Sequence, residues 1–185
     1  MSVIPAGTEV PFTITYLEML QRPEYGPAQL PGDVRLERAI DPPVWFFLSL
    51  YDAVGRDYEW QDRFDQAEED PAALQAFVRS PDVVIWTAIK HGWPQGFFML
   101  DWREPGECDL AYFGLVPQAV GQGLGPLLVQ TAIATGWARE GVEKMTINTC
   151  TLDHPAALRL YQKMGFEPVR REERTRVLTY DRHEG

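Results

Sequence analysis

Apolar and polar positions alternate most regularly in the second half of the chain. Segments 82–90, 95–103 and 108–116 are rich in β-branched and aromatic residues and are bounded by turn residues, so we expect three strands there. The turn-like sequence HGWP joins the first two segments, which should therefore pair as an antiparallel hairpin. A further strand is expected over 144–152, and one or two last strands over 165–181.

The first half of the chain predicts two strands and two helices. The strands are expected over 12–20 and 33–40, and the first helix over 44–55. A second helix is expected over 70–80, with its aspartate as N-cap and the following proline in the first turn. The stretch between the two helices is polar but contains several aromatic residues, and no element is assigned to it.

Two later helices are each framed by glycine. A Gly-x-Gly-x-Gly segment follows the strand at 108–116, and the helix after it is expected to run to about Glu140, with Gly141 as its C-cap. The last helix is DHPAALRLYQKM, with Pro155 in its first turn and Gly165 closing it. Its apolar residues recur on one face: Ala157, Leu160, Tyr161 and Met164.

The composition is that of one folded domain, and we assign residues 1–185 to it. Apolar residues make up 45% of the chain and charged residues 24%, which is typical of a protein with a packed core. The formal net charge of −10 argues against nucleic acid as a partner, because such binding needs clustered Lys and Arg. An acidic surface can attract a cationic partner, or it can serve solubility alone.

Nothing in the sequence predicts a membrane segment, a signal peptide or a metal site. The N-terminal MSVIPAGTEVPF lacks basic and apolar signal regions, and the longest strongly apolar run, 44–51, is too short to cross a bilayer. Cys108 and Cys150 have no metal-binding spacing and form no disulfide framework. We therefore expect a cytoplasmic protein with reduced cysteines, no metal and no membrane partner.

The glycine segment predicts an anion-binding site at the start of a helix. Gly121, Gly123 and Gly125, followed by Pro126, would expose first-turn amides at the positive end of the helix dipole, where phosphates bind. Glycine also permits positive φ and a close approach of ligand to backbone. The spacing matches neither the dinucleotide-binding fingerprint nor the P-loop. On these residues alone, a plain tight turn is the alternative.

Two motifs together resemble those of the GNAT superfamily of N-acetyltransferases. VGQGLGPLLV is similar to the family's acetyl-CoA pyrophosphate loop, and LYQKMGF is similar to its recurring L-Y-x-K-x-G-F. The resemblance implies an α/β fold, a GNAT-like single domain with a central mixed, twisted sheet flanked by helices. It also implies that acetyl-CoA contacts the following residues: Phe113, Gly114, Leu115, Val116, Val120, Gly121, Gln122, Gly123, Leu124, Gly125, Pro126 and His154.

The chain departs from the family's pattern at two positions. Val120 stands where the loop usually begins with Arg or Gln, although Gln118 lies two residues earlier. This departure leaves the backbone amides to hold the phosphates. His154 stands where the family often has Asn, and next to Pro155 it either orients the start of the helix or takes part in proton transfer.

The same resemblance indicates the catalytic residues. It places the hydroxyl of Tyr161 near the thiol sulfur, where a phenol that is protonated at neutral pH can donate to the departing thiolate. Because Tyr161 also lies on the apolar stripe of its helix, a role in packing alone is the alternative. Asp109 is the candidate general base, with Glu107 in reserve, and deprotonation through ordered water would need no single base.

The amine acceptor is expected to bind against the early part of the chain. Its pocket could be lined by aromatic residues, with interleaved carboxylates attracting an ammonium group: Tyr51, Tyr58, Trp60, Phe64, Glu59 and Asp62. The alternative is that these aromatic residues are core.

We therefore expect an N-acetyltransferase that moves an acetyl group from acetyl-CoA directly to a primary amine in a ternary complex, without a metal. The alternatives are a non-catalytic acyl-CoA-binding or sensing domain, and a transferase that uses a longer acyl-CoA. The identity of the amine is open, and a homodimer is an analogy with related proteins only.

Overall fold

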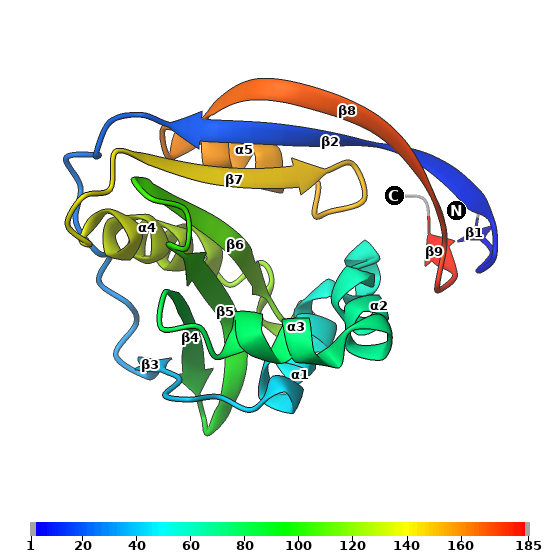
Figure 1. Cartoon of the computed structure of the whole chain (residues 1–185), viewed down its shortest axis with the longest axis horizontal. Coiled ribbons are helices and arrows are strands. Elements are labelled where there is room, and N and C mark those ends of the chain that lie inside the picture. The colour runs from blue at the N-terminus through cyan, green and yellow to red at the C-terminus, as the bar shows by residue number, and fades with distance from the viewer. Residues whose placement is uncertain (1–2, 184–185) are drawn as a thin grey trace.

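Seven strands form one mixed sheet with helices on both of its faces (Figure 1). In this computed structural model, which describes residues 3–183, the strands lie in the order β3-β4-β5-β6-β7-β2-β8. Their bounds are β2 Glu9–Met19, β3 Val34–Arg38, β4 Val83–Lys90, β5 Trp93–Asp101, β6 Glu107–Leu115, β7 Lys144–Cys150 and β8 Glu167–Val177. β6 and β7 are parallel, and the other neighbouring pairs are antiparallel. The predicted α/β fold with a mixed sheet is confirmed.

Five α-helices within the described residues cover the sheet. Their bounds are α1 Val44–Gly55, α2 Asp62–Glu69, α3 Pro71–Val78, α4 Leu124–Trp137 and α5 Ala157–Lys163. Alternation along β5 separates the two faces, because Phe97 and Met99 pack with α1 and α3 whereas Phe98 and Leu100 pack with α4. None of the helices in this part of the chain is long and apolar enough to cross a membrane.

Most elements form where the sequence pattern predicts them. β4 and β5 pair as the expected hairpin, and Asp70 caps α3 by accepting a hydrogen bond from Ala73 N at 3.0 Å. The stretch that the pattern left unassigned forms a 3-10 turn at Arg56–Tyr58 and then α2. Most of its polar residues lie at the surface, Glu59 is buried, and Trp60 and Phe64 pack against the core.

Two helix ends differ from the prediction. α4 ends at Trp137, so Gly141, with φ of 84°, lies in the turn beyond the helix and is not its C-cap. α5 begins at Ala157, so Pro155 precedes the helix and is not in its first turn. The reason is that Ala157 N donates to His154 O at 2.9 Å, which closes a tight turn before the helical hydrogen bonds begin.

The N-terminal strand β2 lies between β7 and β8 and joins the two ends of the chain (Figure 1). It pairs with β7 over residues 14–19 and with β8 over residues 9–18. The β2–β8 ribbon therefore extends beyond β7 toward α2, and it ends in the short pair of β1, Val3–Ile4, with β9, Arg182–His183. This order brings the C-terminal residues next to the turn at the end of α1.

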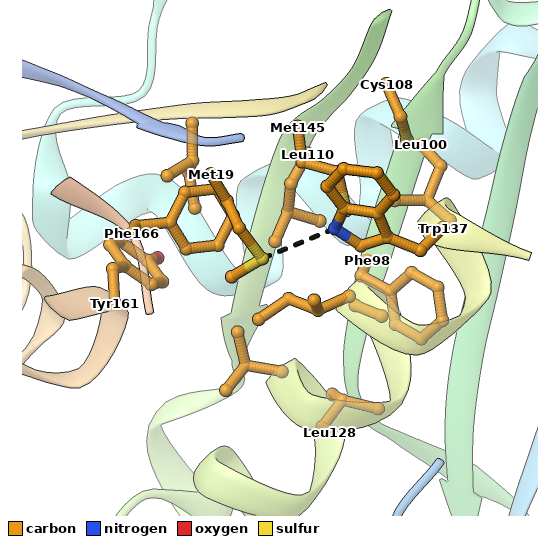
Figure 2. Close-up of a cluster of buried hydrophobic side chains, with 14 of the residues drawn as sticks. Met19, Phe98, Leu100, Cys108, Leu110, Leu128, Trp137, Met145, Tyr161 and Phe166 are labelled. Carbon is orange, nitrogen blue, oxygen red and sulfur yellow. Dashed lines mark hydrogen bonds between the residues drawn. The ribbon is translucent and has the colours of Figure 1, made fainter. Parts of the chain in front are cut away.

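A dense apolar cluster holds α4 against β6 and β7 (Figure 2). Trp137 Nε1 lies 3.3 Å from the sulfur of Met19, and Tyr161 and Phe166 complete one side of the cluster. Gly136 permits this close approach, since a Cβ there would lie 2.6 Å from Cε of Met145. The strands that form the cleft described below therefore rest on a rigid support.

Candidate active site

A cleft opens where the parallel strands β6 and β7 separate. The two strands pair only between residues 107–109 and residues 144–146. Beyond this point a cavity of about 440 Å³ lies between them, bounded also by the glycine segment and by α5. The backbone groups of β6 that face β7 beyond Asp109 therefore have no ladder partner on that strand, and they are available to a ligand.

A β-bulge in β6 changes which face of the sheet its side chains occupy. Met99 pairs with Tyr112 and Leu100 pairs with Leu110, so Ala111 is an extra residue on β6. After the bulge, Tyr112 packs with the helices α1 and α3, and Phe113 packs on the side of α4. The same strand thus contributes to both faces of the site.

The glycine segment forms the N-terminus of α4 at one end of the cleft. Gly121 and Gly123 have φ of 80° and 81°, in the left-handed region, and Gly123 is the N-cap residue. No side chain caps the helix, so its first-turn amides are open to an anion. Gly125 and Pro126 line the cleft as well.

The expected acetyl-CoA contacts divide into two groups. Most of them line the cleft: Phe113, Gly114, Leu115, Val120, Gly121, Gly123, Gly125, Pro126 and His154. The other three point elsewhere. Val116 packs in the core beside α1, and Leu124 is buried between α4 and the face of the sheet that α4 covers. The side-chain amide of Gln122 donates to Gln118 O at 2.7 Å.

Tyr161 lines the cleft and is also a core residue. Its side chain is 5% exposed, and its ring packs edge to face with Phe113 and Phe166 at 6.2 and 6.5 Å between centroids. Burial raises the pKa of Tyr161 above its usual value, and the nearby carboxylate of Asp153 adds to this effect. The phenol is therefore held protonated, as a proton donor must be.

Asp109 lies outside the cleft, where β6 and β7 are still paired. Thr146 Oγ1 is 2.9 Å from both Asp109 Oδ1 and Glu107 Oε1, and its single proton can serve only one of them. Burial raises the pKa of Asp109 to about 6, with a further contribution from the charge of Asp101. A carboxyl with this pKa can exchange a proton close to neutral pH.

Asp153 lines the cleft and was not singled out from the sequence. Its Oδ1 accepts a hydrogen bond from Trp60 Nε1 at 3.1 Å, and its Oδ2 accepts from Thr149 Oγ1 at 2.7 Å and from Cys150 N at 2.9 Å. This carboxylate joins the end of β7 to the turn after α1. The only feature of the sequence that pointed to Asp153 was an aspartate in a turn directly after a strand. Aspartate is common in such turns, so this feature does not identify a site residue.

Two of the four expected acceptor aromatics, Tyr58 and Trp60, line the cleft. Tyr51, which is 2% exposed, and Phe64 pack instead in the aromatic cluster around Tyr112. For these two residues the core alternative holds.

Glu59 and Asp62, which were expected to attract an ammonium group at the acceptor site, do not line the cleft. Both oxygens of the buried Glu59 carboxylate accept backbone N–H bonds, from Thr179 at 2.8 Å and from Tyr180 at 3.3 Å. Asp62 pairs with Arg176 at 3.1 Å. Both carboxylates are therefore engaged in holding the C-terminal segment.

His154 is exposed at the rim of the cleft. Its Nδ1 accepts a hydrogen bond from Ala156 N at 3.2 Å, so it orients the turn before α5. Its ring also meets the ring of Tyr58 edge to face, at 6.4 Å between centroids. Cys150 is a plain thiol nearby, because burial raises its pKa to about 11.

A family model described as the acetyltransferase (GNAT) family matches residues 47–166. The match spans more than half of the 185 residues, so the chain belongs to the GNAT family of acetyltransferases. This family uses acetyl-CoA as the acyl donor. No curated protein matches the chain in sequence.

Solved structures share the fold at low sequence identity. A GCN5-related N-acetyltransferase from Sphaerobacter thermophilus has 16% identity and a TM-score of 0.59, over 94% of this chain and 52% of that chain. A tandem GNAT protein from the clavulanic acid biosynthesis pathway has 14% identity and a TM-score of 0.65, over 93% and 55%. An aminoglycoside acetyltransferase from an uncultured soil metagenomic sample has 16% identity and a TM-score of 0.52, over 74% and 90%. The chain thus spans about half the length of the first two.

Proposed function

We propose that this protein is an N-acetyltransferase that moves an acetyl group from acetyl-CoA to a primary amine within a ternary complex. The observation that carries the proposal is the cleft between β6 and β7, which runs from the uncapped N-terminus of α4 to the side chain of Tyr161. One end suits a pyrophosphate and the other provides a proton donor. The unpaired backbone of β6 lies between them.

The cleft suggests how acetyl-CoA would be held. The amides at the start of α4 and the glycines with positive φ would bind the phosphates. The backbone of β6 between residues 113 and 115 would hold the pantetheine chain and polarise the thioester carbonyl. A hydrogen-bond donor placed in this way lowers the activation free energy by roughly 3 kcal/mol. The side chains of Val116, Gln122 and Leu124 do not line the cleft, so these three residues would act through their backbone only.

The reaction needs one proton donor and one proton acceptor. The amine nitrogen forms a bond to the carbonyl carbon, the carbon–sulfur bond breaks, and the sulfur takes a proton from the hydroxyl of Tyr161. Because Asp109 lies outside the cleft, the amine would lose its proton to this residue through water, and the raised pKa of Asp109 makes it the better acceptor of a proton. Asp153 is closer to the cleft, but both of its oxygens are already engaged by donors.

The first experiment is calorimetric titration of the protein with acetyl-CoA and with free CoA, followed by a thiol-release assay with a panel of amines. Saturable binding and CoA release with one class of amine would support the proposal. Binding without release for any amine would instead support a non-catalytic acyl-CoA-binding domain. Absence of binding would refute the assignment of the glycine segment. A parallel panel of longer acyl-CoA donors tests the acyl chain.

A further inference from the structure

Two loops form the walls of the cleft beyond Tyr161. One wall is the turn after α1, which carries Tyr58 and Trp60, and the other is the loop after β7, which carries Asp153 and His154. The walls contact each other directly, through the hydrogen bond from Trp60 to Asp153 and through the edge-to-face contact of Tyr58 with His154. The width of this end of the cleft is therefore set by how firmly the two loops are joined.

The C-terminal segment 176–182, which we call the C-terminal clamp, joins them a second time from outside. The Arg182 guanidinium donates to Leu152 O at 2.9 Å and to Asp57 O at 3.4 Å. These two carbonyls belong to the residues that directly precede Asp153 and Tyr58. One side chain thus bridges both walls, and the planar fork of a guanidinium places two separate nitrogens for this purpose.

The clamp is itself fixed against the first wall. Glu59 has φ of 62° and is 4% exposed, and its carboxylate accepts the N–H groups of Thr179 and Tyr180. Arg176 donates to Glu59 O and to Asp62, and the Arg56 guanidinium lies over the ring of Tyr180 at 5.8 Å. A buried carboxylate in an unfavourable backbone conformation is held only where its surroundings demand it. Arg182 is therefore presented by a rigid segment.

We propose that Arg182 is a specificity-determining residue, which fixes the acceptor end of the cleft so that it takes small amines and excludes the lysine side chains and N-termini of polypeptides. This inference rests on the proposed function. A polypeptide acceptor would need the two walls to part, so that the chain on either side of its amine could pass between them. Arg182 and the contacts of Trp60 with Asp153 oppose that separation.

The test compares the wild-type protein with Arg182→Ala, Arg182→Lys and the control Arg171→Ala. Arg171 lies exposed on β8, in the same C-terminal part of the chain. Thiol release is measured with spermidine, glucosamine, an amino acid amide and a lysine-containing peptide. The dissociation constant for acetyl-CoA is measured in parallel, because Arg182 bonds to the two loops and not to the glycine segment.

We expect the wild type to use a small amine and not the peptide. Arg182→Ala should raise the KM of that amine about tenfold, as expected for the loss of a charge-assisted hydrogen bond, and should allow turnover of the peptide. Its affinity for acetyl-CoA should match that of Arg171→Ala. Arg182→Lys should fall between the wild type and the alanine variant, since its ammonium keeps the charge and three donors but carries them on a single nitrogen in place of the planar fork. Peptide turnover by the wild type, or an unchanged acceptor KM in Arg182→Ala, would overturn the proposal.

A second measurement does not depend on activity. Amide hydrogen exchange in segments 56–60 and 150–154 should accelerate together in Arg182→Ala and Arg182→Lys, and not in Arg171→Ala, because removing the bridge releases both loops. Unchanged exchange in the two segments would refute the clamp even if the enzyme proved inactive. A wild type that fails to bind acetyl-CoA would refute the proposed function and leave this measurement to decide on the clamp.

Discussion

The raised pKa of Asp109 predicts how the stability of this protein depends on pH. Burial raises that pKa from 3.8 to about 6. A carboxyl group whose pKa rises on folding opposes folding only when it is ionised. The resulting loss of unfolding free energy is absent below pH 3.8, grows between pH 3.8 and about 6, and is constant above about pH 6. The difference of about two pKa units corresponds to roughly 3 kcal/mol of unfolding free energy.

Asp109→Asn isolates this effect. The amide oxygen can still accept a hydrogen bond from the hydroxyl of Thr146, but the side chain cannot ionise. We expect the variant to be more stable than the wild type by roughly 3 kcal/mol above about pH 7, and the difference to shrink below about 1 kcal/mol near pH 4. Urea unfolding at a series of pH values between these limits measures the difference directly.

Glu167→Gln is the matched control, because Glu167 is exposed on β8 and its substitution should shift stability by less than about 0.5 kcal/mol at any pH. A stability difference for Asp109→Asn that does not change with pH would refute the reasoning, and so would a variant that is less stable at high pH. If Asp109 is also the general base, the same variant gains stability and loses kcat/KM near neutral pH, a combination that a purely structural role does not produce.

Three further predictions concern the cleft and its support. Tyr161→Phe should lower kcat about 100-fold while leaving the calorimetric affinity for acetyl-CoA unchanged, since it removes a proton donor and little volume. Gly123→Ala should weaken acetyl-CoA binding about tenfold, because φ of 81° strains alanine at the start of the helix. Gly7 has φ of 83° and lies outside the cleft, so Gly7→Ala should lower the free energy of unfolding without changing the affinity for acetyl-CoA. Gly136→Ala should lower the free energy of unfolding by about 1–3 kcal/mol, since the new methyl group meets the side chains packed on α4. At Gly32 a new methyl group meets no atom within 4 Å, so Gly32→Ala should leave the free energy of unfolding nearly unchanged in the same urea measurement.

Local structure followed from the sequence wherever the determinants lie close together in the chain. The hairpin β4–β5 and the cap at Asp70 depend on residues only a few positions apart, and both formed as predicted. The glycine segment likewise carries its own requirement for positive φ at Gly121 and Gly123. The two helix ends that differ were misread because glycine and proline also form turns outside helices.

Residues whose partners are distant in the chain could not be predicted in this way. Glu59 was expected to attract the amine acceptor, but the amide groups that its carboxylate binds lie 120 and 121 positions later. Asp153 receives its hydrogen bond from Trp60, which is 93 positions away in a stretch with no clear pattern. Periodicity reports which face a residue occupies, and it does not report which other segment meets that face.

The position of β2 explains why these distant partners matter at the acceptor end. Because β2 lies between β7 and β8, β8 is carried one strand farther from β7, and the β2–β8 ribbon extends past the end of β7 toward α2. The residues after β8 then turn back and meet the loop at Leu152 and the turn at Asp57 through Arg182. A strand at the start of the chain thus positions a side chain near its end. The phosphate-binding end of the cleft makes none of these contacts, since the glycine segment and the start of α4 form it. Substitutions in the ribbon should therefore change the choice of amine before they change the binding of acetyl-CoA.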